Sequence, residues 1–200
     1  MTFNLKNKKA FITGSTSGIG LAIAQKLEEY GCQVAINSKN VESFNKVKNS
    51  FNKPVKFICA DMTSEIDSKN AIDQFIKYFG SIDILICNVG SGRSAEPGKE
   101  SKGDWENSIS INLLSATNPI SHSIDFLEKT SGVIICISSI CGDKMIENAP
   151  LTYSSIKAAL NRFVINSCYY LAKKNIRINA ISPGNVFFPG SIWEKKLFDN

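Results

Sequence analysis

The sequence predicts an α/β fold, a doubly wound parallel sheet with helices on both faces in three layers. Short apolar runs alternate with longer amphipathic segments along the chain. The apolar runs are nearly continuous, as in strands that are covered on both faces. A glycine-rich turn, T-G-S-T-S-G-I-G at residues 13–20, joins the first run to the first helical pattern. The 200 residues, 43% of them hydrophobic, predict a single domain over residues 1–200 with a sizeable core.

Six strands and five helices are expected. Strands are predicted at residues 10–13, 33–37, 55–60, 82–88, 133–138 and 177–181, and helices at 18–30, 41–50, 68–78, 102–127 and 152–174. Gly31 is expected to end the first helix, and Pro119 to bend the fourth. Crossovers in such sheets are right-handed, and ligands bind at the carboxyl ends of the strands where the strand order reverses. The residues that follow each strand are therefore the candidate site residues.

The bulk composition narrows the class of partner. The net charge of +5 comes from scattered lysines without an aromatic-interleaved basic stripe, which favours a solvated basic surface. The charge is also compatible with an anionic cofactor or substrate, and it favours nucleic acid least. His122 is the only histidine and no cysteines form a C-x-x-C pair, so no metal site is expected. Cys59, Cys87 and Cys136 lie in apolar runs and are expected to be buried thiols of a reducing compartment. No apolar run is long enough to span a membrane, which predicts a soluble, cytoplasmic protein without a membrane partner.

The glycine-rich turn after the first strand is a candidate anion site. Backbone N–H groups at a helix N-terminus are unpaired, and the helix dipole favours a negative charge there. Gly14 allows the turn off the strand, Gly18 allows a diphosphate to approach the backbone, and Gly20 allows close packing of helix on strand. The G-x3-G-x-G spacing differs from the usual G-x-G-x-x-G, so the turn alone is equally consistent with a plain connection.

The ends of the second and third strands bear on which dinucleotide is bound. A carboxylate that would accept the ribose 2′-OH of NAD is absent, while Ser38 and Lys39 offer two donors that suit a 2′-phosphate. The alternative is a solvated loop lysine. Asp61, followed by Met62, is placed to accept a hydrogen bond from an adenine amino group, or else Asp61 or Thr63 caps the next helix.

The fourth strand leads into Asn88 and Gly90. Asn88 can bond the backbone of neighbouring strands, and Gly90 permits the close approach of a ribose, although a plain turn has the same composition. The polar loop at residues 91–103 that follows either lines a pocket or is simply mobile.

The fifth strand carries the group with catalytic chemistry. Ser138 and Ser139 end it, and Tyr153 and Lys157 share one face of the next helix. A lysine ammonium is expected to lower the pKa of a neighbouring phenol, which can then exchange a proton with a carbonyl or alcohol oxygen. A strand-end serine can hold that oxygen. On its own, Y-x-x-x-K is a common surface pattern.

Taken in order along the chain, these motifs resemble the short-chain dehydrogenase/reductase family. The resemblance covers nearly the whole chain and rests on T-G-S-T-S-G-I-G, C-N-V-G at 87–90, S-I-N-L around Asn112, I-S-S-I-C-G at 137–142, Y-S-S-I-K at 153–157 and I-R-I-N-A-I-S-P-G at 176–184. It implies a Rossmann fold, a nicotinamide cofactor and the catalytic set Asn112, Ser139, Tyr153 and Lys157, with Ser138 as an alternative serine. The cofactor-binding residues that it implies are Gly14, Ser15, Ser17, Gly18, Ile19, Gly20, Ser38, Lys39, Asp61, Met62, Asn88, Gly90, Tyr153, Lys157, Pro183 and Gly184.

The chain departs from the family pattern at three places. Val89 replaces a smaller alanine. The usual threonine after Pro183-Gly184 is absent, and Asn185 or Ser191 is a candidate substitute for binding the carboxamide. The chain ends at Asn200, inside what would be the substrate-covering segment, where family members continue into further helices and a seventh strand.

These observations predict an NADP(H)-preferring oxidoreductase that transfers hydride between nicotinamide and a small carbonyl or alcohol substrate. Reductases of 3-oxoacyl thioesters and of sugar pathways are the substrate classes considered. The alternative is a non-catalytic dinucleotide-binding module or an inactive truncated fragment. The resemblance also implies a homodimer or homotetramer, formed through the helices at 102–127 and 152–174.

Overall fold

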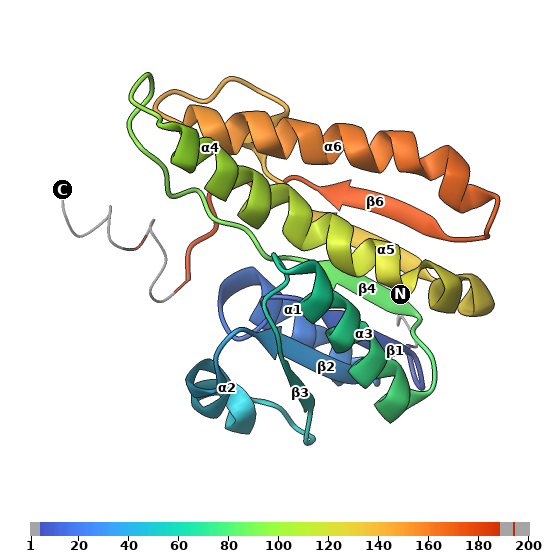
Figure 1. Ribbon diagram of the computed structural model, residues 1–200. Helices are drawn as coiled ribbons and strands as arrows, with labels where there is room; N and C mark the ends of the chain where they lie inside the picture. Colours follow the sequence, from blue (N-terminus) through green and yellow to red (C-terminus); the bar gives the residue numbers. More distant parts are fainter. Residues whose placement is uncertain (1–4, 189–193, 195–200) are drawn as a thin grey trace.

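A six-stranded parallel sheet in the order β3-β2-β1-β4-β5-β6 forms the centre of the computed structural model, which describes residues 5–188 and 194. From β1 the chain proceeds outward to β3 and then crosses to β4 on the other side of β1 (Figure 1). The strand order therefore reverses between β1 and β4, where the expected ligand site lies. The strands are β1 (Lys9–Ile12), β2 (Gln33–Ser38), β3 (Lys56–Cys59), β4 (Ile84–Cys87), β5 (Val133–Ile137) and β6 (Arg177–Ile181).

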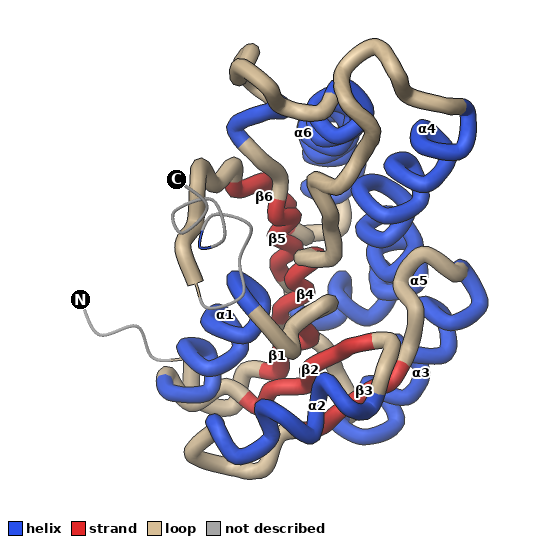
Figure 2. Tube along the Cα trace, turned by 90° about the vertical axis from the view of Figure 1, so that its left-hand side faces the viewer, coloured by secondary structure: helices blue, strands red, loops and turns tan. Residues whose placement is uncertain are grey.

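The helices lie on both faces of the sheet, as Figure 2 shows in a view along its edge. Alternate residues of one strand belong to opposite faces. Phe11 packs in a cluster with residues of α3, α5 and α6. Ala10 and Ile12 pack in a second cluster with residues of α1 and α2. The helices are α1 (Gly18–Glu29), α2 (Val41–Val47), α3 (Glu65–Phe79), α4 (Lys102–Ile109), α5 (Ser115–Thr130) and α6 (Leu151–Ala172).

The predicted fold class and the alternation of strands and helices are confirmed, with one interruption. The segment expected as a single fourth helix is α4, a π-helical turn at Ser110–Leu114, and α5. The interruption precedes Pro119, which lies inside α5 and has no N–H to donate to the carbonyl of Ser115. At the end of α1, Gly31 takes a φ of 91°, as expected for a helix stop.

The edge position of β3 explains one difference between the predicted and the observed burial of the cysteines. Cys87 and Cys136 are buried, but the expectation for Cys59 is wrong because this thiol is exposed. β3 is the edge strand of the described sheet, so its residues are covered less completely than those of β4 and β5.

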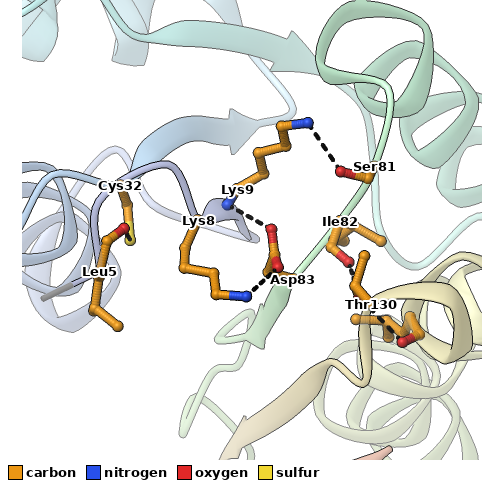
Figure 3. Close-up of polar contacts among 9 residues, drawn as sticks. Leu5, Lys8, Lys9, Cys32, Ser81, Ile82, Asp83 and Thr130 are labelled. Atoms are coloured by element: carbon orange, nitrogen blue, oxygen red, sulfur yellow. Dashed lines mark hydrogen bonds and ion pairs between the residues drawn. The ribbon is translucent and has the colours of Figure 1, made fainter.

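Short polar contacts join β1 to β4 at the amino end of the sheet, where Figure 3 shows them in close-up. The Asp83 carboxylate accepts hydrogen bonds from Lys8 Nζ at 2.7 Å and from the Lys9 backbone N–H at 3.0 Å. These contacts fix the start of both strands and therefore the register of their carboxyl ends. None of the described helices is long and apolar enough to cross a membrane.

Candidate active site

A cavity of about 420 Å³ opens at the carboxyl ends of β1, β4 and β5. It lies at the reversal of strand order, where the sequence placed the site. Its walls come from the glycine-rich turn, the segment after β4, the end of β5, α6 and the chain after β6. The lining residues that the sequence had singled out are Gly14, Ser17, Gly18, Ile19, Asn88, Val89, Gly90, Ser138, Ser139, Tyr153, Lys157, Pro183 and Gly184.

Three glycines give the first turn a shape that larger residues cannot adopt. Gly14 and Gly18 have φ values of 57° and 54°, in the left-handed region that favours glycine. A Cβ on Gly20 would stand 2.5 Å from Asn88 Nδ2 and 2.7 Å from the carbonyl oxygen of Gly14. Asn88 Nδ2 donates to the carbonyls of Thr13 and Gly14 at 3.1 and 2.9 Å, so Asn88 connects the turn to the end of β4.

Two buried side chains, Asn37 on β2 and Ser15 in the turn itself, connect the turn to β2. Asn37 Oδ1 accepts a hydrogen bond from the Gly14 N–H at 3.1 Å. Ser15 is fully buried, and its hydroxyl donates to the Ile12 carbonyl at 2.6 Å and accepts from the Asn37 N–H at 2.9 Å. The expectation that the Ser15 side chain contacts a cofactor therefore needs correction, because that hydroxyl is used inside the protein.

The N-terminus of α1 faces the cavity. Ser17 is its N-cap residue, and its side chain makes no capping hydrogen bond. Ser17, Gly18 and Ile19 line the cavity at this point. Backbone N–H groups at a helix start attract anions, and a diphosphate is the anion that a dinucleotide presents. The side chain of Val89 also packs here, because a Cβ on Gly14 would stand 2.9 Å from its Cγ2.

The residues predicted to read the adenosine half lie beside the cavity and do not line it. Lys39 Nζ lies 3.9 Å from Asp61 Oδ2, and both side chains are exposed to solvent, by 76% and 37%. Asp61 Oδ1 accepts from the Thr63 N–H and hydroxyl at 2.9 and 2.8 Å, while Ser64 is the N-cap of α3. Burial raises the pKa of Asp61, but the Thr63 hydrogen bonds and the Lys39 charge outweigh it, so the net pKa is lowered.

Ser38 and Met62 differ from each other in accessibility. The Ser38 hydroxyl accepts from the Asn40 N–H at 3.3 Å near the surface. Met62 is 2% exposed and packs in the core, so its side chain is out of reach of a cofactor. A contact of Met62 with the cofactor would therefore be through its backbone, and it stays a prediction.

Ser139, Tyr153 and Lys157 come together from two separate segments. The Ser139 hydroxyl lies close enough to the Tyr153 phenol to lower its pKa, and it accepts a hydrogen bond from the Cys141 N–H at 3.2 Å. Lys157 Nζ donates to the Ile137 carbonyl at 2.8 Å and lies 5.8 Å from the centre of the Tyr153 ring. Ser138 instead donates to the Lys157 carbonyl at 3.4 Å. Of the two serines left open by the sequence, both line the cavity, and Ser139 is the one that affects the pKa of the phenol.

Burial dominates the electrostatics of this group. It raises the pKa of Tyr153, against the lowering effect of the Ser139 hydrogen bond. It also lowers the pKa of Lys157 to about 8. The direction of the Tyr153 pKa is therefore opposite to the lowering that the sequence predicted, because loss of hydration is the largest effect on the phenol and outweighs the lowering by Ser139.

Asn112 lies behind the cavity on the π-helical turn and is 2% exposed. Its Oδ1 accepts from the Ser91 N–H at 2.9 Å, and its Nδ2 donates to the Ser91 carbonyl at 3.0 Å and to the Ser108 hydroxyl at 3.3 Å. A Cβ on Gly90 would stand 3.1 Å from both Asn112 Oδ1 and Lys157 Nζ. The absence of a side chain at Gly90 therefore lets these two groups flank the same backbone segment.

Sequence reasoning missed two lining residues, Val186 and Phe188. The tip of the Phe188 ring reaches Gly18, where a Cβ would stand 2.7 Å from its Cζ. The candidate Asn185 is exposed and is not part of the cavity wall, and Ser191 lies outside the described residues. Phe188 could have been predicted from its position, because it follows Pro183-Gly184 at short spacing. It was missed because an aromatic side chain is not an obvious cofactor contact.

Known proteins share this arrangement. A family profile for short chain dehydrogenases matches residues 8–190. The chain belongs to the short-chain dehydrogenase/reductase family. An uncharacterized oxidoreductase of Staphylococcus epidermidis is 29% identical over 186 residues, which cover 92% of this chain and 80% of that protein. This short-chain dehydrogenase/reductase is thus an NAD(P)-dependent oxidoreductase that acts on alcohol or carbonyl groups.

Two solved structures resemble this short-chain dehydrogenase/reductase closely in fold. A family member of unknown function from Caenorhabditis elegans, solved with cofactor, has a TM-score of 0.89 and 25% identity, covering 98% of this chain and 78% of its own. An NAD⁺-bound xylitol dehydrogenase has a TM-score of 0.89 and 28% identity, covering 98% and 76%. A nicotinamide dinucleotide fits the residues present here, because one cavity joins the α1 N-terminus, which offers N–H donors for a diphosphate, to Tyr153 and Lys157.

Proposed function

We propose that this protein is an NADP(H)-preferring carbonyl reductase in which Tyr153 is the proton donor. The observation that carries the proposal is the meeting of Ser139, Tyr153 and Lys157 in one cavity next to the glycine turn, with the Lys157 ammonium bonded to the Ile137 carbonyl and 5.8 Å from the centre of the Tyr153 ring. The bound nicotinamide supplies hydride to the substrate carbon or accepts it in reverse. Gly14, Ser17, Gly18, Ile19, Gly90, Pro183 and Gly184 would hold the cofactor.

In this proposal each catalytic side chain has one role. Ser139 donates a hydrogen bond to the substrate oxygen and orients it toward Tyr153. Tyr153 gives its proton to that oxygen as hydride arrives at the carbon, and its raised pKa keeps the phenol protonated at neutral pH. Lys157 stabilises the phenolate that results. Asn112 positions the chain around Gly90 and Ser91 through its backbone contacts.

The preference for NADP(H) rests on Lys39. It is the exposed cation at the end of β2, and the carboxylate near it, Asp61, already binds Thr63. Lys39→Ala is expected to weaken NADPH binding about tenfold while leaving NADH binding nearly unchanged, because only the 2′-phosphate needs a cation. Titration of both cofactors by fluorescence measures this, with the exposed Lys77→Ala as control. Equal losses for NADPH and NADH in Lys39→Ala would contradict the preference.

The function is tested by mixing the purified chain with NADPH and a panel of small ketones, 3-oxoacyl thioesters and keto sugars. We expect oxidation of NADPH at 340 nm with at least one class, and the productive class defines the substrate. Cofactor binding without turnover across the panel would favour a non-catalytic dinucleotide-binding module. No binding at all would favour an inactive fragment.

The assembly state belongs to the same proposal. We expect a homodimer or homotetramer formed through α4, α5 and α6. α4 exposes Trp105 and Ile109, and α6 exposes Tyr169. Sedimentation velocity at micromolar concentration measures it, and a monomer would contradict it. A cytoplasmic location stays a prediction from the sequence.

A further inference from the structure

The loop between β4 and α4 makes one unusual hydrogen bond to a distant part of the protein. Within the described part of the chain, the hydrogen bonds of residues 92–100 join partners two or three residues apart, with one exception. That exception joins the hydroxyls of Ser94 and Thr152 at 2.7 Å, across 58 positions of sequence. Thr152 is in the first turn of α6 and directly precedes Tyr153.

The segment between the two anchored points crosses the catalytic tyrosine. Its first end, Ser91, is held by both polar atoms of the Asn112 side chain. In the middle, a Cβ on Gly92 would stand 3.9 Å from both Cδ1 and Cε1 of the Tyr153 ring, so the backbone runs along that ring. At its other end Ser94 is tied to Thr152. Residues 91–94 therefore cover the ring as a wall that is fixed at both ends.

The environment of the hydroxyl pair makes it more than a surface contact. Thr152 is fully buried, and Ser94 is half-buried. A buried hydroxyl left without a partner costs about 1–3 kcal/mol, so the native position of Ser94 is favoured over any position of the loop that breaks the bond. The rest of the loop has only local bonds in the described chain, so this pair decides where the wall stands.

We propose that the Ser94–Thr152 hydroxyl pair is a positioning device for catalysis, which holds residues 91–94 as the wall that covers Tyr153 and faces the substrate. The inference rests on the proposed role of Tyr153. Loss of either hydroxyl releases the wall, so the substrate is aligned less well and water reaches the phenol. Ser94 and Thr152 do not themselves line the cavity, whereas Gly92 of the wall does, so the variants leave the glycine turn and the α1 N-terminus unchanged and NADPH affinity is preserved.

The first test is a double-mutant cycle with Ser94→Ala and Thr152→Val, in the intact chain with NADPH and the productive substrate of the panel. Each single variant is expected to lower kcat/KM about five- to tenfold, and the double variant no further, since one bond is lost in all three. NADPH affinity stays at the wild-type value. Ser94→Thr and Thr152→Ser retain a hydroxyl and restore most of the activity. Additive losses, or wild-type activity in the single variants, would overturn the proposal.

The second readout is the pH profile of carbonyl reduction, which needs the protonated phenol. Burial raises the pKa of Tyr153, so hydration in the variants brings the alkaline limb to lower pH than in wild type. The groups that face the phenol are Ser139 and Cys141 from the segment after β5 and Lys157 from α6. The charge of the wall, Arg93, is exposed, and the other charges of the loop are Glu96, Lys99 and Glu100. An unchanged limb with reduced kcat would assign the pair a purely structural role.

A third measurement does not depend on turnover and separates this proposal from the proposed function. Hydrogen exchange at the amides of residues 92–100 is expected to accelerate in Ser94→Ala and in Thr152→Val, while exchange in β4 and β5 stays slow. Ser121→Ala is the matched control, since its hydroxyl donates to the Asn118 carbonyl one turn earlier on α5. Unchanged exchange in the loop would refute the tether even in a protein that is fully active. Inactive wild type with accelerated loop exchange would refute the function and keep the tether.

Discussion

The two ends of the sheet each carry a hollow lined by polar residues, and only one of them has catalytic chemistry. The hollow at the amino end is the larger, about 1030 Å³, and Lys6, Lys9, Glu28 and Glu29 are among its lining residues. Asp83 nearby is engaged by Lys8 and Lys9, as Figure 3 shows. Burial raises the pKa of the Cys32 thiol there to about 11, so it stays protonated and unreactive.

The hollow at the carboxyl end is smaller, about 420 Å³, yet it combines a helix N-terminus with buried titratable groups. Tyr153 and Lys157 have pKa values displaced by burial, and Ser139 lowers the pKa of the phenol against that displacement. In a parallel sheet with right-handed crossovers the start of each helix faces the carboxyl end, so donors gather there. Chemistry and strand direction identify the site, and the volume of a hollow does not.

The sharpest contrast between the two ends is expected from removing one phenol hydroxyl at each. Tyr153→Phe should lower kcat about 10²- to 10⁴-fold, because it removes the proton donor, with NADPH affinity nearly unchanged. Tyr30→Phe, in the amino-end hollow, should leave kcat at the wild-type value. Steady-state reduction assays with both variants measure this. A Tyr153→Phe enzyme with near wild-type kcat would refute the assignment of the proton donor.

The buried ammonium predicts a pH dependence of stability that belongs to the carboxyl end. The pKa of Lys157 is about 8 in the folded protein against 10.5 ordinarily. Below pH 8 the side chain is charged in both states, so the cost of burying its charge lowers the stability of the fold in full. Between these values the unfolded chain binds more protons, and stability rises with pH. The free energy of unfolding of Lys157→Met should exceed that of wild type by up to about 3 kcal/mol at pH 7, and this difference should close toward pH 10.

Urea unfolding of Lys157→Met and wild type at several pH values measures that gap. A constant gap between Lys157→Met and wild type would show that the ammonium is not desolvated.

Glycine substitutions compare a binding turn with a structural one. Gly20→Ala brings a Cβ within 2.5 Å of Asn88 Nδ2, so it should destabilise the fold by about 1–3 kcal/mol and weaken NADPH binding as well. Gly31→Ala, where φ is 91°, should cost about 1–2 kcal/mol of stability but leave NADPH affinity unchanged. Thermal melting and cofactor titration report the two effects separately. Equal losses of affinity would contradict the division between the two ends.

The smallest effect is expected at the amino end itself. Asp83→Asn loses the ion pair with Lys8, whose side chain is 49% exposed, and weakens the bond from the Lys9 N–H. It should cost about 1 kcal/mol of stability with kcat and KM unchanged. Chemical unfolding in low and high salt measures the loss, which salt should reduce. A change in KM would show that the register of β1 and β4 is coupled to the cavity.

Much of the fold could be predicted because it rests on local patterns. The apolar runs, the glycine-rich turn and the stop at Gly31 each depend on a few neighbouring residues, and the sheet contains all six predicted strands. The gathering of Ser139, Tyr153 and Lys157 was also predicted, through motif order and strand direction. These properties follow from backbone conformation and from the rule that strand ends of a parallel sheet meet at one edge.

The sequence by itself thus determined the family, the fold and the location of the site. Only the tertiary structure decided what each side chain does there. Ser15 and Met62 are turned inward, Cys59 is exposed by the edge strand, and Phe188 reaches Gly18. It also reversed the expected shift of the Tyr153 pKa. Residues distant in sequence decide whether a side chain is buried and which group it bonds. The pKa of a side chain depends on its burial and on its bonding partners, so it too is decided by the tertiary structure.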